Sequence, residues 1–276
     1  MIIVKPHSGL CNRMRAIDSC ISIQKNNPRH SQIKMLWELN PLLNCPFQHL
    51  FKPIENITLV DSDPYLNYFL LYRDKECVGI KKKIRKVLYS CLGHNYKYFD
   101  DISVQEFAYQ PYYWNNSKND FVIHSCIGFY SPDIQNASSF KPVQKLQHLI
   151  DQEVAKFIKP VTGLHIRRTD SIKSIAKSPT GLFLKHIEDS LAKDDNQLFF
   201  LATDDIQEEN LFKSAFGNYI LTQDNKDLSR DTQKGIEDAL VDLYALSNTR
   251  LIVGSYWSSF SKTAAGLTKI PLQIIS

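Results

Sequence analysis

The sequence predicts an α/β fold in two halves, and three observations support that prediction. Short runs rich in β-branched and aromatic residues alternate with segments of helical periodicity along most of the 276 residues. The alternation is interrupted once, from about residue 44 to residue 121, where the chain is aromatic and irregular. Polar clusters follow directly after several of the apolar runs. This alternation is typical of sheets covered by helices rather than of sandwiches or helical bundles.

The first half opens with the pattern of a βαβ unit. The run "MIIVK" (1–5) predicts a strand, "NRMRAIDSCISIQKN" (12–26) a helix and "QIKMLWEL" (32–39) a second strand. After the irregular stretch, "FVIHSCIGFY" (121–130) predicts another strand, and residues 141–158 predict a long amphipathic helix.

The second half alternates regularly after Pro160. The predicted strands are 162–167, 197–203, 218–222, 250–255 and 272–275, and the predicted helices are 181–192, 208–216, 235–247 and 258–267. We therefore expect two Rossmann-like domains, residues 1–158 and 159–276, facing each other across a cleft. Ligands of such sheets lie beyond the carboxyl ends of the strands.

Charge and cysteine usage exclude some classes of function. The net charge of +4, from 33 basic and 29 acidic residues, lacks the excess needed to follow a phosphate backbone, so no nucleic-acid partner is expected. The six cysteines form no CxxC pair, so the sequence indicates neither a zinc site nor a thioredoxin motif, and reduced thiols are favoured over disulfides. The first residues contain no apolar signal segment, which predicts a cytoplasmic protein.

The stretch "TGLHIRRTDS" places a cationic cluster at the end of a predicted strand. Side chains alternate along a strand, so His165 and Arg167 share one face and Arg168 takes the other. A guanidinium matches the paired oxygens of a phosphate or carboxylate. A surface ion cluster, in which Asp170 neutralises an arginine, is the alternative, and the residues alone favour neither.

Three further strand ends carry groups that suit an anion or a metal. Asp204 and Asp205 follow a central strand, where they suit either a divalent metal or, as is favoured, the cap of the next helix. Ser258 and Ser259 begin a helix, either as plain caps, which are favoured, or as a phosphate site. Asn12 and Arg13 follow a glycine turn after the first strand. Together, four anion-friendly strand ends favour a nucleotide-diphosphate ligand.

Several of these motifs resemble those of one known family. "GLCNRMRAI", "HIRRTD", "LATDD" and "DLYALSNTRLIVGSYWSSFS" occur in the order seen in GDP-fucose-dependent fucosyltransferases of the two-domain GT-B fold. The likeness is closest to the core α1,6-fucosyltransferases and the nodulation-factor fucosyltransferases, and it extends to the O-fucosyltransferases. It covers residues 162–267 well and the first fifty residues more thinly.

The resemblance implies roles for individual residues. Arg167 matches the arginine that holds the donor diphosphate, and Asp242 matches the aspartate that binds the guanine edge. Asp204 and Asp205 match an acidic pair that is structural or lies on the acceptor side. The implied donor-binding residues are Asn12, Arg13, His165, Arg167, Arg168, Asp242, Ser258, Ser259 and Phe260.

The resemblance also implies an inverting displacement that needs neither a metal nor another cofactor. Arg167 neutralises the charge that grows on the leaving diphosphate, a task that a metal performs elsewhere. The base proposed for the α1,6 enzymes is a glutamate, but Ile175 stands at its place here. Asp170 is the nearest carboxylate, as a base or as a partner that orients the arginine, and Asp18 and Glu38 are alternatives.

The acceptor is less defined by the sequence. Residues 79–92 predict a basic amphipathic helix, which is either an ordinary solvated helix or a contact with the inner membrane leaflet that brings a lipid-linked glycan acceptor. The aromatic run 107–116 is either a platform for a sugar or, as is favoured, part of the core. Alternatives to fucosyl transfer are a transferase that uses another GDP-sugar and a non-catalytic protein that binds a GDP-sugar or glycan.

Overall fold

A computed structural model describes residues 1–64 and 96–276 of the chain, which form two compact units. Unit 1 contains Met1–Leu39 and Pro53–Ser139, and unit 2 contains Asn40–Lys52 and Phe140–Ser276. The predicted basic helix at 79–92 lies outside the described residues. Within the described part of the chain, no helix is both long and apolar enough to cross a bilayer.

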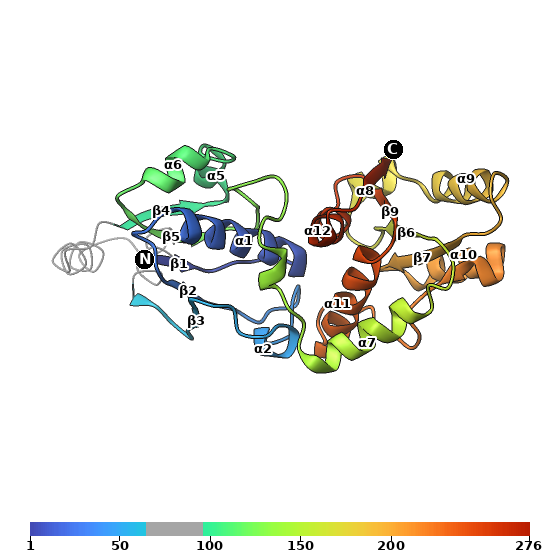
Figure 1. The fold of residues 1–276 in the computed structure, drawn as a ribbon, viewed down its shortest axis with the longest axis horizontal. Coiled ribbons are helices and arrows are strands. Elements are labelled where there is room, and N and C mark those ends of the chain that lie inside the picture. The colour runs from blue at the N-terminus through green and yellow to red at the C-terminus, as the bar shows by residue number, and fades with distance from the viewer. Residues whose placement is uncertain (65–95) are drawn as a thin grey trace. The chain divides into compact units, whose positions relative to one another are not determined.

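Unit 1 is built on a five-stranded parallel sheet of order β3-β2-β1-β5-β4. Its strands are β1 (Ile2–Val4), β2 (Ile33–Met35), β3 (Ile57–Leu59), β4 (Tyr96–Asp100) and β5 (Asp120–His124). Among its described residues, the helices are α1 (Leu10–Asn26), α5 (Asp101–Gln105) and α6 (Pro111–Asn116), with a 3-10 turn η1 at Ala137–Ser139. Figure 1 shows α1 lying over this sheet, and all three residues of β1 are buried as a result.

The aromatic run of unit 1 contributes Trp114 to the core of that unit. Trp114 is fully buried and donates from Nε1 to the carbonyl of Phe107 at 3.0 Å. Its ring lies 5.0 Å from that of Phe99 and 5.4 Å from that of Phe121. Tyr109 and Tyr112 of the same run are exposed. The core interpretation of this run is therefore confirmed for Trp114.

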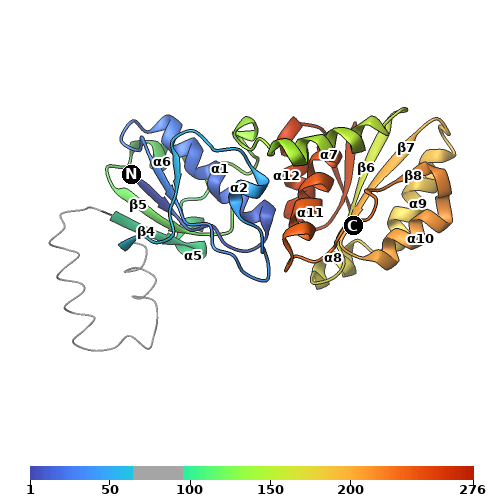
Figure 2. The ribbon, with the colours of Figure 1, turned by 90° about the horizontal axis from the view of Figure 1, so that it is seen from below.

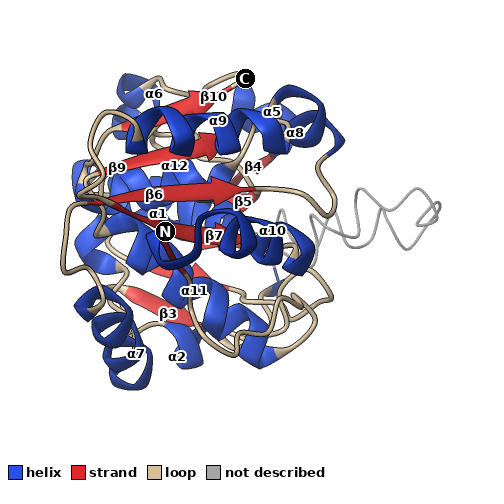
Figure 3. Ribbon diagram, turned by 90° about the vertical axis from the view of Figure 1, so that its right-hand side faces the viewer, coloured by secondary structure: helices blue, strands red, loops and turns tan. Residues whose placement is uncertain are grey.

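Unit 2 is built on a second five-stranded parallel sheet, of order β10-β9-β6-β7-β8. Its strands are β6 (Val161–Ile166), β7 (Leu198–Thr203), β8 (Ile220–Leu221), β9 (Leu251–Ser255) and β10 (Leu272–Ile275). Its helices are α2 (Phe47–Leu50), α7 (Gln144–Ala155), α8 (Ile172–Lys177), α9 (Thr180–Leu191), α10 (Ile206–Phe216), α11 (Gln233–Ser247) and α12 (Ser259–Thr268), with a 3-10 turn η2 at Gly217–Tyr219. Figure 3 shows β10, β9, β6 and β7 in this order from top to bottom.

Helices cover both faces of the unit 2 sheet (Figure 2), which explains why β6 and β7 are buried along their whole length. Leu164 and Ile166 of β6 pack with Phe183 of α9 and Phe212 of α10 on one face. Gly163 faces α11 on the other, where an added Cβ would lie 2.9 Å from Leu246. The alternation of β6 therefore assigns even positions to one helical layer and odd positions to the other.

Residues 140–158 fold with unit 2. The α7 helix packs on α11, and the hydroxyl of Tyr244 on α11 donates to the carbonyl of Phe140. Lys145 of α7 also pairs with Glu237 of α11 at 2.6 Å. These contacts explain why the helix predicted at 141–158 belongs to the second compact unit, although it precedes the first strand of that sheet.

The strand order identifies the ligand edge of each sheet. In unit 2 the first strand of the sheet, β6, lies between β7 and β9, the order of a doubly wound sheet. Connections leave β6 and β9 in opposite directions, so a crevice opens beyond their carboxyl ends. In unit 1 the corresponding place lies beyond β1 and β5.

Gly254→Ala tests the close packing of β9 against α12. A methyl group there would lie 2.7 Å from Cβ and Oγ of the fully buried Ser261. We expect the substitution to lower the free energy of unfolding by about 1–3 kcal/mol, because the core must shift to admit it. Urea denaturation measures this change.

Gly181→Ala is the matched control. No atom lies within 4 Å of the position of its added Cβ, in the first turn of α9. Its unfolding free energy should be unchanged or raised by up to about 1 kcal/mol, since alanine favours the helix. Equal effects of the two substitutions would contradict the packing that we describe.

Candidate functional site

The carboxyl ends of β6 and β9 are joined by one hydroxyl. Ser255 Oγ accepts a hydrogen bond from the backbone N–H of Arg167 at 3.0 Å and donates to the carbonyl of His165 at 3.3 Å. Ser255 is fully buried, so both bonds are shielded from water. This bridge fixes where β6 ends, and therefore the direction in which the cluster that follows begins.

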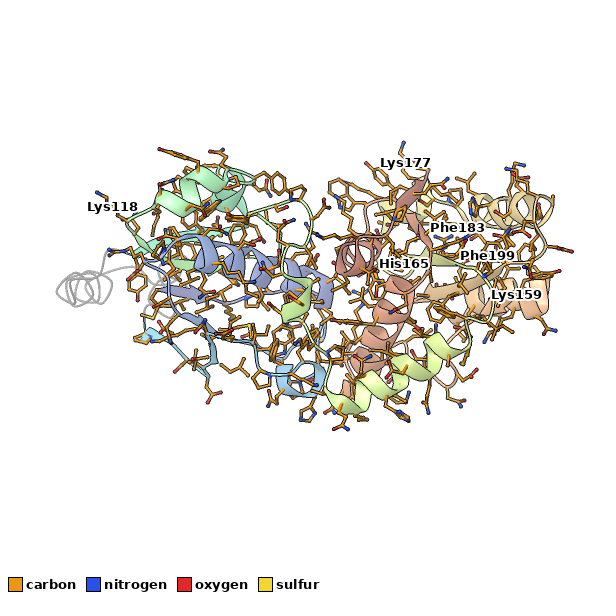
Figure 4. The ribbon with its side chains drawn as sticks, viewed as in Figure 1. Lys118, Lys159, His165, Lys177, Phe183 and Phe199 are labelled. Carbon is orange, nitrogen blue, oxygen red and sulfur yellow. The ribbon has the colours of Figure 1, made fainter. Side chains whose placement is uncertain are left out.

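His165 points toward α12. Its ring stacks on that of Phe260, with centroids 4.8 Å apart and planes 19° apart, and Figure 4 shows it beside that helix. Burial lowers the pKa of His165 to about 3, and the nearby Asp204 carboxylate offsets this only in part. The imidazole is therefore neutral. Its Nδ1 is buried and has no hydrogen-bond partner among the described residues, which leaves it available to a ligand.

Arg167 stands in a network of two arginines and two aspartates. Its guanidinium pairs with Asp204 Oδ2 at 2.6 Å and with Asp170. Arg230 reaches the same two carboxylates, at 2.9 Å from Asp170 Oδ2 and 3.7 Å from Asp204 Oδ2. The side chains of Arg167 and Arg230 remain 21% and 29% exposed, so an anion from solvent can reach both. Sequence reasoning missed Arg230, which lies in a loop with no motif around it.

Arg168 extends to the opposite face of β6. It is buried and donates from Nε to Glu208 Oε1 on α10 at 2.5 Å. Two further bonds, each of 3.1 Å, join its terminal nitrogens to the carbonyl of Ser178 and to Thr180 Oγ1. The structure thus separates the two neighbouring arginines: Arg168 lies against α10, whereas Arg167 pairs with Asp170 and Asp204.

The acidic pair after β7 divides between two tasks. Asp204 accepts from the backbone N–H of Arg168 and from Thr169 Oγ1, both at 2.7 Å, and so ties the loop after β6 to the end of β7. Asp205 caps α10 by accepting from the backbone N–H of Gln207 at 2.7 Å. Both contacts suit structural carboxylates.

The start of α12 offers backbone donors at the same edge. Ser258 is the N-cap and accepts from the N–H of Phe260 at 3.3 Å, while Ser259 is the first helical residue. Trp257, just before the cap, has a left-handed backbone with φ of 58° and a side chain that is 71% exposed. The free N–H groups and the dipole of a helix start attract negative charge.

Asp242 lies on α11, buried in a cluster of charged groups. Its Oδ2 is 3.3 Å from Lys226 Nζ, which also pairs with Glu209 at 2.9 Å. Burial raises the pKa of Asp242 to about 6, and Lys226 opposes the rise. Its Oδ1 is buried and has no hydrogen-bond partner among the described residues, which suits a carboxylate that receives an N–H group from a ligand.

The predicted unit 1 residues lie in the first turn of α1. Arg13 is fully buried and donates to the carbonyls of Ser8 at 2.9 Å and Glu38 at 2.6 Å, with Trp37 stacked 4.8 Å away. Burial lowers its pKa to about 10. Asn12 is half-buried beside it. The guanidinium of Arg13 thus holds the loop after β1.

The candidate bases are occupied. Asp170 accepts a hydrogen bond from Arg167 at Oδ1 and one from Arg230 at Oδ2. Asp18 is buried and accepts from the backbone of Gln135 and Asn136, and Glu38 pairs with Lys5 at 3.1 Å. Ile175, which stands at the place of the family's glutamate, lies on α8 and is 43% exposed. Its side chain cannot accept a proton.

Comparison with solved structures supports the fold assignment. No protein-family model matches the chain. The α-1,6-fucosyltransferase NodZ soaked with GDP-fucose aligns with a TM-score of 0.63 at 15% identity, over 96% of this chain and 92% of NodZ. A mutant of Arabidopsis thaliana FUT1 in complex with GDP aligns with a TM-score of 0.62 at 15% identity, over 99% of this chain and 69% of FUT1.

A third structure, POFUT1 in complex with GDP, aligns with a TM-score of 0.56 at 11% identity, over 100% of this chain and 98% of POFUT1. The structural similarity extends over both units of this chain, each of which is built on a parallel sheet. The prediction of an α/β fold of the GT-B class, with two Rossmann-like units, is confirmed. At these identities the likeness establishes the fold.

Replacing Arg167 or Arg168 with alanine should lower the free energy of unfolding by different amounts. Arg168→Ala leaves Glu208 buried without its charged partner and should lower the free energy of unfolding by about 3–5 kcal/mol. Arg167→Ala should cost only about 0–1 kcal/mol, because Asp170 keeps Arg230 and Asp204 keeps its other donors. Denaturant unfolding of both variants tests this, and a larger loss for Arg167→Ala would contradict the assignment.

Proposed function

We propose that the chain is a glycosyltransferase that moves fucose from GDP-fucose to a hydroxyl of a glycan or lipid-linked glycan. One observation carries the proposal: at the β6/β9 edge, Arg167, the start of α12 and two buried polar atoms without partners lie in one unit. The fold is that of solved structures whose names state fucosyltransferase activity and a bound GDP or GDP-fucose. Unit 2 binds the donor in this proposal, and unit 1 serves the acceptor.

The donor diphosphate binds Arg167 and the first N–H groups of α12. In the ligand-free protein, Asp170 and Asp204 neutralise Arg167, so the diphosphate competes with carboxylates for its guanidinium. Asp170 keeps Arg230 when Arg167 turns to the ligand. A planar guanidinium binds two phosphate oxygens at once, which supports its choice for this task.

The guanine base is recognised by Asp242 and His165. Guanine presents adjacent N–H donors, and the unpartnered Oδ1 of Asp242 suits one of them. The neutral imidazole of His165 offers its unpartnered Nδ1 to the nucleoside, and its stacking on Phe260 holds the ring in one orientation. Arg168 supports the site from the other face of β6 and does not contact the donor in this proposal.

The reaction is an inverting displacement. The acceptor oxygen forms a bond to the fucose C1 while the bond from C1 to the diphosphate oxygen breaks, and GDP leaves with the electron pair. Arg167 stabilises the charge that develops on that oxygen, so no divalent metal is assigned to the diphosphate. Asp170 orients Arg167, and since both its oxygens engage arginines, the proton of the acceptor is left to solvent or to an acceptor-side group.

A second candidate function is GDP-sugar binding without catalysis. Ile175 at the place of the family's glutamate and the engagement of Asp170 by two guanidinium groups favour it. Release of GDP from GDP-fucose with a panel of glycan acceptors separates the candidates. Transfer supports the enzyme, whereas GDP binding without turnover on any acceptor supports the binding protein.

Arg167→Ala should reduce the rise in melting temperature that GDP causes. Losing a charged hydrogen-bond partner costs about 1.5–3 kcal/mol, so the dissociation constant for GDP should rise about tenfold to about a hundredfold. The wild-type rise should be the same with EDTA as with MgCl2, because arginine binds the diphosphate.

Arg29→Ala, which removes a half-exposed arginine of unit 1, is the control and should leave the GDP response intact. An unchanged response in Arg167→Ala, or a response that needs magnesium, would overturn the assigned role of Arg167.

GDP binding should weaken as the pH falls through about 6, because protonated Asp242 loses an acceptor for guanine. The ligand-free protein should show the opposite trend: the pKa of Asp242 is raised on folding, so its contribution to stability is present below about 4 and lost as the pH rises through about 6. Calorimetric titration of GDP between about pH 5 and about pH 7.5 measures the first effect.

Asp242→Asn removes the titrating group while Lys226 keeps Glu209 as a partner. This variant should bind GDP weakly at every pH in that range and keep only the shallower slope caused by titration of the terminal phosphate of GDP near about pH 6. A profile that falls toward low pH as steeply as in the wild type would show that another group is responsible.

A further inference from the structure

Three metal-ligating side chains meet at the carboxyl edge of the unit 1 sheet. His7 follows β1, Asp101 begins α5 directly after β4, and Cys126 follows β5. One ligand atom from each lies within 4.8 Å of the other two. The cluster sits beyond β1 and β5, where the strand order of this sheet places a ligand crevice. Nothing in the proposed transfer uses it.

Two distances within the cluster are close to those between ligands of one zinc ion. His7 Nε2 lies 3.0 Å from Asp101 Oδ2, and Cys126 Sγ lies 3.5 Å from the same oxygen. Tetrahedral Zn²⁺ with nitrogen, oxygen and sulfur at ordinary bond lengths separates its ligands by about 3.4–3.6 Å. His7 Nε2 therefore lies nearer to Asp101 Oδ2 than two zinc ligands would, whereas Cys126 Sγ lies at the expected separation from that oxygen.

Neighbouring groups already orient the ligand atoms. Asp101 Oδ1 accepts from Ser125 Oγ at 2.8 Å and from the backbone N–H of Cys126 at 2.9 Å, which leaves Oδ2 to face the cluster. His7 Nδ1 lies 3.2 Å from Ser8 Oγ, so its Nε2 is the nitrogen that faces the cluster. Zinc ligands in proteins are held by such outer hydrogen bonds.

Charge and access favour a zinc ion over a harder cation. Burial and the Asp101 carboxylate raise the pKa of the Cys126 thiol, so zinc binding releases its proton to solvent. The carboxylate and the thiolate then supply the two negative charges that balance Zn²⁺, and nitrogen and sulfur ligands disfavour a magnesium or calcium site. The side chains of His7 and Asp101 are 28% and 35% exposed, so an ion from solvent can reach the cluster.

We propose that His7, Asp101 and Cys126 bind one Zn²⁺ ion, with the fourth position taken by water or by an oxygen of a ligand. The sequence does not reveal the site, because its ligands come from three separate segments and form no CxxC or HxxxH spacing. The site belongs to unit 1 alone, and it stands whether or not unit 2 binds GDP-fucose.

Calorimetric titration of the metal-free full chain with ZnCl2 tests the site. We expect each chain to bind one zinc ion with high affinity. Co²⁺ bound in place of zinc should give the intense visible absorption bands of tetrahedral coordination and a thiolate charge-transfer band in the near ultraviolet. His7→Ala, Asp101→Asn and Cys126→Ser should each weaken zinc binding by more than about tenfold. His148→Ala, an exposed histidine on α7, is the control and should bind as the wild type.

Cys126→Ser distinguishes a metal site from a hydrogen-bonded cluster. Its hydroxyl can still donate to Asp101, so the fold should persist, and the melting temperature of the metal-free variant checks this. Zinc binding that survives in Cys126→Ser, a cobalt spectrum without the thiolate band, or no high-affinity zinc binding by the wild type would overturn the proposal.

Discussion

The parallel pairing of β6 with β9, closed by the Ser255 hydroxyl, is the constraint on which the arrangement of the proposed donor site depends. The pairing places the residues after β6 beside the start of α12, although the two segments are far apart in the sequence. Strand alternation then directs His165 toward Phe260 and Arg168 toward Glu208. A one-residue shift of β6 would exchange these faces and bury the wrong arginine.

The site is arranged in advance, but its charge is already compensated. Arg167 and Arg230 share Asp170 and Asp204, so the cluster carries no net charge before a ligand binds. In our proposal, a diphosphate with two charges displaces the carboxylates from Arg167, and Asp170 then keeps its pair with Arg230. Nδ1 of His165 and Oδ1 of Asp242 have no partner among the described residues. A ligand that forms hydrogen bonds with these buried atoms is therefore favoured over one that does not.

Much of unit 2 could be predicted because its signals are local. The predicted strand 272–275 coincides with β10, and the predicted helix 181–192 differs from α9 by one residue at each end. Contacts between distant segments could not be predicted, because no local pattern in the sequence encodes them. Examples are the packing of α7 on α11, the ion pair of Arg230 with Asp170 and the pairing of Asp242 with Lys226. In unit 1, β3, β4 and the short α5 and α6 were missed, since very short elements in an aromatic stretch carry little periodicity.

The central claim is that the β6/β9 edge of unit 2 binds a GDP-sugar, and a crystal structure of the protein with GDP tests it most directly. The account predicts the diphosphate within hydrogen-bonding distance of the Arg167 guanidinium and the first N–H groups of α12, with a guanine N–H on Asp242 Oδ1. A nucleotide bound at another edge, or a diphosphate held there while Arg167 keeps both aspartates, would contradict it.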